Sequence, residues 1–282
     1  MKLLRKIKSK FKWLKKVTIK KIPVYIEKEK SNILEGRCAI VTGGTGGIGN
    51  AIAEAYLQAG ATVIIVGRNQ NKLDDCYKKL NEKYPNIFIY KMDMTNFSNL
   101  ENDFNNIKKL VNCKIDILVN CAGVVSSMNF PNITEEEFDK IMNTNLKGVV
   151  MLSQVFSKYM IENKIQGNIL NIGSSSCYRP AVSAYTMSKW ALRGFTLGSA
   201  KTLIKYGIVV NGIAPGPTAT QMLGADDSNL NWPEIDAKRM STVSEISSMA
   251  VRLVSNECRM IVGEMINITG GAGTLTFDDI KY

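Results

Sequence analysis

A tyrosine and a lysine four residues apart are the side chains best suited to chemistry in this sequence. Tyr185 and Lys189 would lie on one face of a helix, because an α-helix turns once in about 3.6 residues. An ammonium group beside a phenol favours the phenolate and lowers the pKa of a tyrosine from about 10. Such a tyrosine can donate a proton to a carbonyl or accept one from an alcohol. Alone, the spacing is weak, because it arises by chance on exposed helix faces.

A glycine-rich run, Thr42–Gly49, is the second motif. It follows the apolar run Cys38–Val41 and precedes a helical pattern from Ile48 to Gln58. Glycines there let backbone N–H groups approach a pyrophosphate, with the positive end of the helix behind them. The sequence therefore predicts a dinucleotide site, and a purely structural turn is the alternative.

The end of the second predicted strand bears on the choice of cofactor. Val66-Gly67-Arg68-Asn69 contains no carboxylate to hold a free ribose 2′-hydroxyl. Arg68 can instead bind a 2′-phosphate and stack on adenine. NADP(H) is favoured, and NAD(H) stays open. The alternative is that Arg68 is a solvated residue at the start of the next helix.

Composition removes several classes of chemistry. The chain of 282 residues has no histidine, which excludes Ser-His-Asp and Cys-His catalysis and removes the commonest metal ligand. Its six cysteines form no CxxC pair, so we expect no metal site and reduced thiols in a cytoplasmic protein. No apolar run reaches the roughly 18 residues of a membrane span.

The basic charge is concentrated at the N-terminus. Residues 1–30 carry twelve Lys or Arg against Glu27 and Glu29, so they supply +10 of the formal net charge of +11. The nearly neutral remainder argues against nucleic acid as a partner. Residues 1–21 read as a basic amphipathic helix that Pro23 ends. Attachment to an anionic membrane surface, docking on the body or a neighbouring subunit, and a disordered tail all remain open.

Strand-like and helix-like segments alternate from Arg37 onward, which predicts an α/β fold. Strands are expected at 38–41, 61–66, 86–91, 114–119, 167–172, 208–213 and 265–268. Helices are expected at 48–58, 71–83, 97–111, 134–162, 183–206 and 243–255. The prediction is one doubly wound, Rossmann-type parallel sheet of about seven strands with helices on both faces. It occupies residues 34–282, after a basic extension of residues 1–33.

From about Leu34 to Gly271 the chain resembles the short-chain dehydrogenase/reductase family. The motifs that carry the resemblance are TGxxxGxG at Thr42–Gly49, Asp93 after the third strand, Asn120-Cys121-Ala122-Gly123, Asn145, YxxxK at Tyr185 and Lys189, and Pro215-Gly216. Cys121 departs from the family's second Asn, and Thr269 stands where Asp is usual. The departure at Thr269 bears only on local packing.

The resemblance implies a catalytic set of Asn145, Ser174, Tyr185 and Lys189. The family's serine usually lies thirteen residues before the tyrosine, but that position is Ile172. Ser174 fits best by its distance from the strand end, with Ser175 next and Ser176 also nearby. The implied cofactor-binding residues are Gly43, Thr45, Gly47, Ile48, Gly49, Arg68, Asn69, Asp93, Met94, Asn120, Ala122, Gly123, Tyr185, Lys189, Pro215, Gly216, Thr218 and Thr220.

The resemblance also implies roles for these residues. Tyr185 would exchange the proton, Lys189 would bind the nicotinamide ribose, and Asn145 would hold a water. Asp93 would hold the adenine amino group, Thr220 the nicotinamide carboxamide and Ser174 the substrate oxygen. A homo-tetramer or dimer through helices 135–162 and 183–206 is implied as well.

The activity expected is hydride transfer between a nicotinamide and a carbonyl or secondary alcohol. A 3-oxoacyl thioester reductase is the first expectation, and a sugar, polyol or small-ketone reductase is the alternative. A non-catalytic dinucleotide-binding protein is a rival of another class. The segment Gln221–Met240 should cover the site, where Met222, Leu223, Leu230 and Trp232 favour a partly apolar pocket. Packing of this segment on its own body is the alternative.

Overall fold

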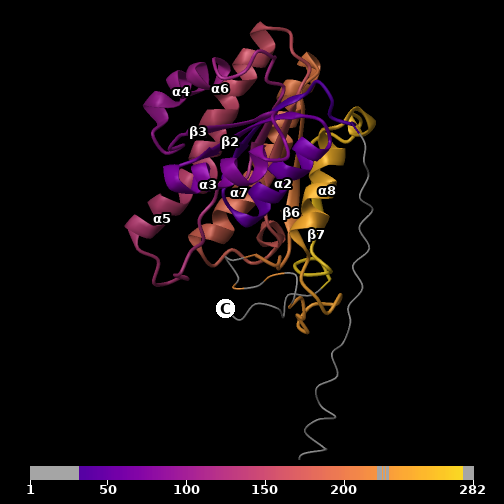
Figure 1. Ribbon diagram of the computed structural model, residues 1–282. Coiled ribbons are helices and arrows are strands. Elements are labelled where there is room, and N and C mark those ends of the chain that lie inside the picture. Colours follow the sequence, from indigo (N-terminus) through magenta and orange to yellow (C-terminus); the bar gives the residue numbers. More distant parts are fainter. Residues whose placement is uncertain (1–31, 221–223, 225, 227–228, 276–282) are drawn as a thin grey trace, which may run out of the picture.

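A seven-stranded sheet forms the centre of the computed structural model, which describes residues 32–220, 224, 226 and 229–275 (Figure 1). Every strand pairs parallel to its neighbours. The strands in sheet order are β3 (Ile87–Lys91), β2 (Thr62–Gly67), β1 (Cys38–Thr42), β4 (Ile117–Asn120), β5 (Asn168–Ile172), β6 (Val209–Pro215) and β7 (Met265–Ile268). The predicted Rossmann-type sheet is therefore confirmed.

Helices cover both faces of the sheet (Figure 1). The helices α2 (Gly47–Gln58), α3 (Gln70–Asn81) and α8 (Val243–Val254) pack on one face, and α4 (Leu100–Lys108), α6 (Gly148–Glu162) and α7 (Ala184–Leu203) on the other. In β1, Ala39 and Val41 belong to the hydrophobic core under α2, α3 and α8, whereas Cys38 and Ile40 belong to the core under α4, α6 and α7. Successive strand residues point to opposite faces, so a strand covered on both sides is apolar throughout.

The predicted helix 134–162 contains an irregularity that its sequence pattern does not show. Helix α5 (Glu135–Met142) runs into a π-helical segment, Asn143–Lys147, and then into α6. A Cβ on Gly148 would lie 2.9 Å from the carbonyl oxygen of Met94, so the chain passes very close to the end of β3 here. Such π segments insert one residue into a helical turn, and this one contains Asn145.

The sheet order reverses between β1 and β4, and the carboxyl ends of these strands flank a crevice where such folds bind ligands. Residues 32–37 lie at the opposite end, immediately before β1, where the buried Leu34 donates its N–H to the Ala59 carbonyl at 2.9 Å. The predicted basic helix of residues 1–21, like Met222 and Leu223, falls outside the described residues. Within the described part of the chain, no helix has the length and apolar character needed to span a membrane.

Candidate active site

The glycine-rich turn between β1 and α2 packs against the segment that follows β4. Gly43 has a left-handed φ of 64°, and a Cβ built on it would lie 2.7 Å from the Cα of Ala122. A Cβ on Gly49 would collide with the carbonyl oxygen of Gly43. Only glycine permits this backbone conformation and this approach at Gly43 without strain. The turn thereby brings the start of α2 next to the end of β4.

The N-terminus of α2 is arranged to receive an anion. No side chain caps its first turn, and that turn contains no acidic residue. The first N–H groups of a helix lack intrahelical partners and carry partial positive charge. Gly46, Gly47, Ile48 and Gly49 line a cavity of about 470 Å³. These donors can therefore hold phosphate oxygens of a ligand in that cavity.

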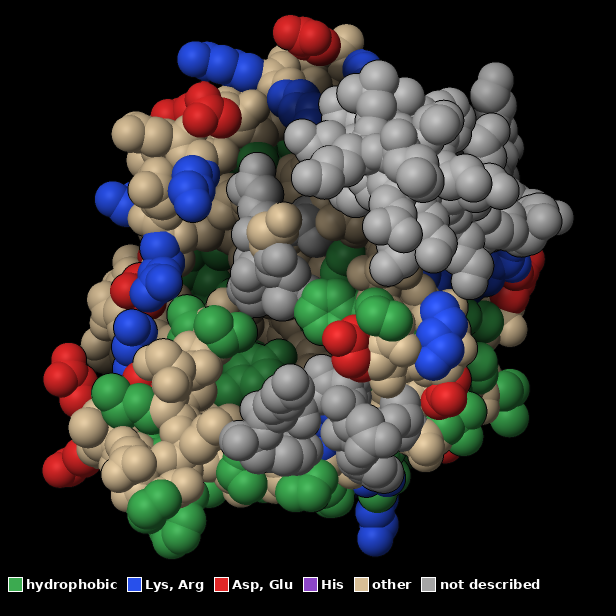
Figure 2. Space-filling model, turned by 90° about the horizontal axis from the view of Figure 1, so that it is seen from below, with side chains coloured by type: hydrophobic (Ala, Val, Ile, Leu, Met, Phe, Trp, Pro, Cys, Tyr) green, Lys and Arg blue, Asp and Glu red, His purple; other side chains and the backbone are tan. Residues whose placement is uncertain are grey.

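The cavity opens at the carboxyl ends of the strands, on the face seen in Figure 2, where hydrophobic side chains lie in and around a hollow. Thirteen residues expected at the site from the sequence line it: Gly43, Thr45, Gly47, Ile48, Gly49, Arg68, Asp93, Met94, Ala122, Gly123, Tyr185, Lys189 and Thr220. Among the described residues, seven others expected there do not: Asn69, Asn120, Asn145, Ser174, Pro215, Gly216 and Thr218.

Two cations line the cavity near the end of β2. Arg68 follows β2, and Lys72 projects from the first turn of α3. No sequence motif marks Lys72, and it lies near Arg68 in the cavity because the helix that carries it begins directly after the Asn69 cap. Asn69 lies outside the cavity because its side chain caps α3, accepting the Lys72 N–H at 3.0 Å. Two positive charges at this position can bind a doubly charged group.

Asp93, which follows β3, lies close enough to Arg68 for their charges to interact. Partial burial raises the pKa of Asp93, but hydrogen bonds from the Thr95 hydroxyl (2.7 Å) and N–H (2.9 Å), together with the Arg68 charge, outweigh it. The net effect lowers the pKa of this carboxyl below its ordinary value. Asp93 is therefore ionised at neutral pH and available as an acceptor at the cavity wall.

Tyr185 and Lys189 both reach the cavity from the first two turns of α7. Ser183 starts this helix by accepting the Thr186 N–H at 3.2 Å. The Lys189 side chain is buried, and its Nζ donates to the carbonyl of Ile172 at 2.9 Å. The same Nζ lies 5.6 Å from the centroid of the Tyr185 ring. The pair singled out in the sequence thus shares one cavity wall, with the amine fixed in place.

Asn145 faces Lys189 across Gly123. A Cβ on Gly123 would lie 3.4 Å from Asn145 Oδ1 and 3.9 Å from Lys189 Nζ. The amide of Asn145 accepts the Val124 N–H and donates to the Val124 carbonyl, both at 2.8 Å. Asn145 is buried, so it lies behind the cavity wall and fixes the backbone that forms it.

The serine cluster follows β5. Ser174 is half-buried, and its Oγ accepts the Ser176 N–H at 3.1 Å. Ser175 and Ser176 are buried, and Ser175 Oγ accepts from the buried Arg179 at 3.3 Å. None of the three serines lines the cavity, but Gly173 does. Ser174 directly follows Gly173, so it is nearer to the cavity along the chain than Ser175 or Ser176. This position favours Ser174 as the candidate catalytic serine.

At the end of β4, one side chain points into the core and the next one lines the cavity. The side chain of Asn120 is buried, and its Nδ2 donates to Ser153 at 3.0 Å and to Asn171 at 2.9 Å, which directs it into the core. Cys121, where the family usually has Asn, lines the cavity. Burial raises the pKa of the Cys121 thiol to about 12, although the Lys189 charge opposes the shift. Cys121 is therefore a neutral thiol.

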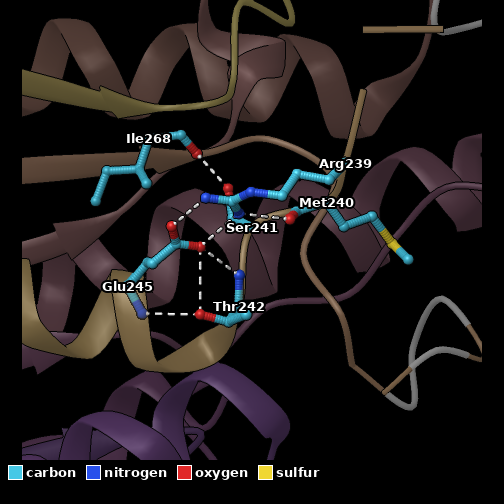
Figure 3. Close-up of polar contacts among 6 residues, drawn as sticks. All are labelled: Arg239, Met240, Ser241, Thr242, Glu245 and Ile268. Carbon is cyan, nitrogen blue, oxygen red and sulfur yellow. Dashed lines mark hydrogen bonds and ion pairs between the residues drawn. The ribbon is translucent and has the colours of Figure 1, made fainter. Parts of the chain in front are cut away.

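A polar network holds the segment that carries Thr220. Thr218 pairs with Ser241, whose hydroxyl donates to the Ile268 carbonyl at 3.3 Å (Figure 3). Pro215, Gly216 and Thr218 thus fix the backbone from which Thr220 reaches the cavity, without lining it themselves. Thr220 packs on the glycine turn: a Cβ on Gly47 would lie 2.8 Å from its Cγ2.

The same network starts α8. Thr242 and Glu245 form a capping box, in which the Thr242 N–H donates to the Glu245 carboxylate at 2.8 Å. Arg239 forks onto that carboxylate at 2.6 and 2.9 Å (Figure 3). Burial raises the pKa of Glu245, but the hydrogen bonds from Arg239 and Thr242 and the Arg239 charge outweigh it and lower the pKa.

We expect Glu245→Gln to lower the free energy of unfolding at pH 7 by about 1–2 kcal/mol. Because the folded state depresses the pKa of Glu245, its stabilising effect is complete above the ordinary carboxyl pKa. It is lost as the pH falls through the lower, folded-state pKa. Urea unfolding of both proteins from pH 7 into the acid range measures this. Glu257→Gln, at an exposed carboxyl, is the control; a deficit independent of pH would contradict the prediction.

Comparison with known proteins shows the family to which the chain belongs. The family model for short chain dehydrogenases matches residues 37–231. The 3alpha-hydroxysteroid dehydrogenase of Mediterraneibacter gnavus is 34% identical over 247 residues, covering 85% of this chain and 98% of that protein. The 3-oxoacyl-[acyl-carrier-protein] reductase of Aquifex aeolicus is 31% identical, covering 84% and 98%. The gluconate 5-dehydrogenase of Gluconobacter oxydans is also 31% identical, covering 84% and 95%.

Solved structures agree with these relatives. A short chain dehydrogenase from Bacillus anthracis superposes with a TM-score of 0.77 at 29% identity, covering 84% of this chain and 97% of that one. The doubly wound sheet with its glycine-rich turn defines a Rossmann-type protein. The chain belongs to the short-chain dehydrogenase family, whose members are oxidoreductases that act on alcohol and carbonyl groups and bind NAD(H) or NADP(H).

Proposed function

We propose that this protein is an NADP(H)-dependent oxidoreductase that interconverts a carbonyl and a secondary alcohol. One observation carries the proposal: a single cavity is lined by Arg68 after β2 and by Tyr185 and Lys189 on α7. In the sheet, β1 and β4 lie between β2, which precedes Arg68, and the strands next to α7. The uncapped start of α2 follows β1, so it lies between Arg68 and the Tyr185–Lys189 pair. An extended dinucleotide has this sequence of parts, with adenosine, pyrophosphate and nicotinamide in a row.

The residues present fit such a cofactor. The α2 N–H groups would hold the pyrophosphate, since Gly43 and Gly49 leave no side chain between the backbone and the ligand. Asp93 would hold the adenine amino group, and Thr220 the nicotinamide carboxamide. Arg68 and Lys72 would bind a 2′-phosphate, and the end of β2 offers no carboxylate for a free 2′-hydroxyl. These two cations support NADP(H) over NAD(H), and that preference favours reduction in the cell.

The bound nicotinamide supplies or accepts the hydride. In reduction, Tyr185 donates a proton to the substrate oxygen, and in oxidation it takes the proton back. Lys189, whose Nζ is held by the Ile172 carbonyl and lies 5.6 Å from the centroid of the Tyr185 ring, would bind the nicotinamide ribose. Asn145, across Gly123 from Lys189, would help to hold a water that connects the lysine to solvent. Ser174 orients the substrate oxygen.

The substrate class is tested by NADPH consumption over a panel of carbonyl compounds with the full chain. A 3-oxoacyl thioester is the first candidate, and relatives named as 3-oxoacyl-[acyl-carrier-protein] reductases support it. A sugar, polyol or small ketone is the second, supported by the relative named gluconate 5-dehydrogenase. Tight NADPH binding without turnover of any carbonyl would instead favour a non-catalytic dinucleotide-binding protein.

We also propose a homodimer or homotetramer in the cytoplasm, assembled through the 135–162 and 183–206 helices. Along α7, Trp190 and Leu197 are 43% and 62% exposed, and a Cβ on Gly194 or Gly198 would meet nothing within 4 Å. An apolar stripe with small residues suits close approach of a second helix. The mass of the full chain in solution, measured by light scattering, tests this assembly.

The basic extension supports peripheral attachment at the inner membrane surface. Residues 1–21 contain ten Lys or Arg and no acidic residue. Each cation near an anionic surface contributes about 1 kcal/mol at low salt. We expect the full chain to co-sediment with vesicles containing anionic lipid, less so at high salt, and a chain lacking residues 1–21 to stay in the supernatant. Equal binding by both chains would end this part of the proposal.

A further inference from the structure

The carboxylate of Glu137, in the first turn of α5, gathers donors from the segment after β4. It accepts the Ser127 N–H at 2.9 Å, the Ser127 hydroxyl at 3.0 Å and the Met128 N–H at 3.0 Å. The Ser126 hydroxyl lies in very short contact with the same carboxylate. A single side chain thus fixes three consecutive residues of a segment that is neither helix nor strand.

These contacts favour an ionised acceptor. The hydrogen bond from Ser126, followed by those from Ser127 and Met128, holds the pKa of Glu137 below its ordinary value. Three of the donors meet Oε1, and only the Ser127 hydroxyl meets Oε2. A glutamine could keep these contacts, because its carbonyl oxygen can replace Oε1 and a hydroxyl can accept from its amide. Alanine removes all of them.

Both ends of this segment are tied to the candidate catalytic residues. At one end, Val124 exchanges two hydrogen bonds of 2.8 Å with Asn145. At the other, the Phe130 N–H donates to the carbonyl of Val182 at 2.8 Å, three residues before Tyr185. Residues 124–130 therefore run from Asn145 to the start of the helix that carries Tyr185.

The two side chains of this segment that line the cavity are apolar. Val124 and Val125 line the cavity, and Val125 is 54% exposed. Phe130, further along, is 76% exposed. Apolar side chains left exposed beside a polar site gain free energy when a ligand covers them, at about 25 cal/mol per Å² of apolar surface.

We propose that Glu137 is a positioning residue that holds the segment 124–130, so that Val124 and Val125 form one wall of the substrate site, and that this wall takes the apolar arm of a ketone or secondary alcohol. The inference rests on the proposed function, because it assumes that the substrate carbonyl meets Tyr185. It adds a substrate class, a carbonyl compound with an apolar chain of several carbons, and a residue that acts on substrate binding without touching the substrate.

The first test compares Glu137→Ala with Glu136→Ala. Both remove one carboxylate from the first turn of α5, but position 136 is exposed and outside the contacts described above. With 2-octanone, Glu137→Ala should raise KM about tenfold, which corresponds to about 1.4 kcal/mol, because the hydrogen bonds that order the wall are lost. The values of kcat and of the Kd for NADPH should stay nearly unchanged. Amide exchange at Ser127 and Met128 should become faster in this variant alone. Unchanged KM and unchanged exchange would overturn the role of Glu137.

The second test shortens the wall. Wild-type protein should prefer 2-octanone to 2-butanone in kcat/KM, and Val125→Ala should reduce that preference about tenfold, since each buried methylene contributes about 0.8 kcal/mol. Met260→Ala, at a 94% exposed side chain before β7, is the matched control. An unaltered preference in Val125→Ala would overturn the apolar wall.

A third measurement separates this inference from the proposed function. Calorimetric binding of the two ketones to the protein with oxidised cofactor needs no turnover, so it judges the wall even if no carbonyl consumes NADPH. A wild-type protein that binds 2-octanone more tightly than 2-butanone, with the difference reduced in Val125→Ala, would support the wall without supporting catalysis. Equal binding of both ketones by the wild type would reject it.

Discussion

Replacing Tyr185 by phenylalanine should abolish nearly all turnover while NADPH still binds. The substitution removes one hydroxyl and keeps the ring, whose centroid lies 5.6 Å from the Nζ of Lys189. A positioned proton donor contributes about 10²–10⁴-fold to the rate, so kcat should fall by at least about a hundredfold. The Kd for NADPH should change by less than about twofold, because the N-terminus of α2 and the two cations after β2 are untouched. Steady-state NADPH consumption and a fluorescence titration measure the two quantities.

A control for this variant lies on the same stretch of chain. Tyr206 ends the short 3-10 helix Ile204–Tyr206 directly after α7 and is 43% exposed. Tyr206→Phe removes the same atom far from the cavity and should keep the wild-type rate. A Tyr185→Phe protein with the wild-type rate would reject the assignment of Tyr185 as the proton donor.

Replacing Arg68 by alanine should weaken the binding of NADP(H) about 10–100-fold and leave the binding of NAD(H) within about twofold. The guanidinium lines the cavity beyond β2, where the two cofactors differ only by the 2′-phosphate. A hydrogen bond between charged groups contributes about 1.5–3 kcal/mol, which gives that range. The ratio of the two dissociation constants, measured by titration, reports the effect without any substrate.

Two further variants sharpen this experiment. Lys72→Ala should produce a smaller loss in the same direction, because a lysine makes a point contact rather than a fork. Lys78→Ala, on an exposed side chain in the last turn of α3, removes the same charge away from the cavity and should change neither constant. If Arg68→Ala weakens the binding of NADP(H) and of NAD(H) equally, the arginine supports the fold of the site and does not bind the 2′-phosphate.

The fold was predictable because its signals are local and repeated. In β1 all five residues are buried, as expected for a strand covered on both faces, and the glycine-rich turn follows at once. Each predicted strand and helix occurs in the described structure, with differences at the ends. At the site, the glycine turn, Arg68 and the Tyr185–Lys189 pair were predictable because each is a short motif fixed by backbone geometry.

Other parts of the site depend on contacts between distant segments, which spacing does not reveal. The π-helical turn at Asn143–Lys147 leaves no mark on the apolar pattern, yet it sets where Asn145 meets Val124. Asn120 was expected at the cofactor, but Ser153 and Asn171 draw its side chain into the core. Asn69 was also expected there, but the local need to cap α3 takes its side chain.

The place where the chain joins the sheet has a consequence for how the protein could be anchored. Residues 32–37 meet the amino end of β1, whereas the cavity opens at the opposite, carboxyl ends of the strands. The extension therefore joins the body on the side of the sheet away from the mouth of the cavity. A substrate can reach that mouth without passing the point of attachment.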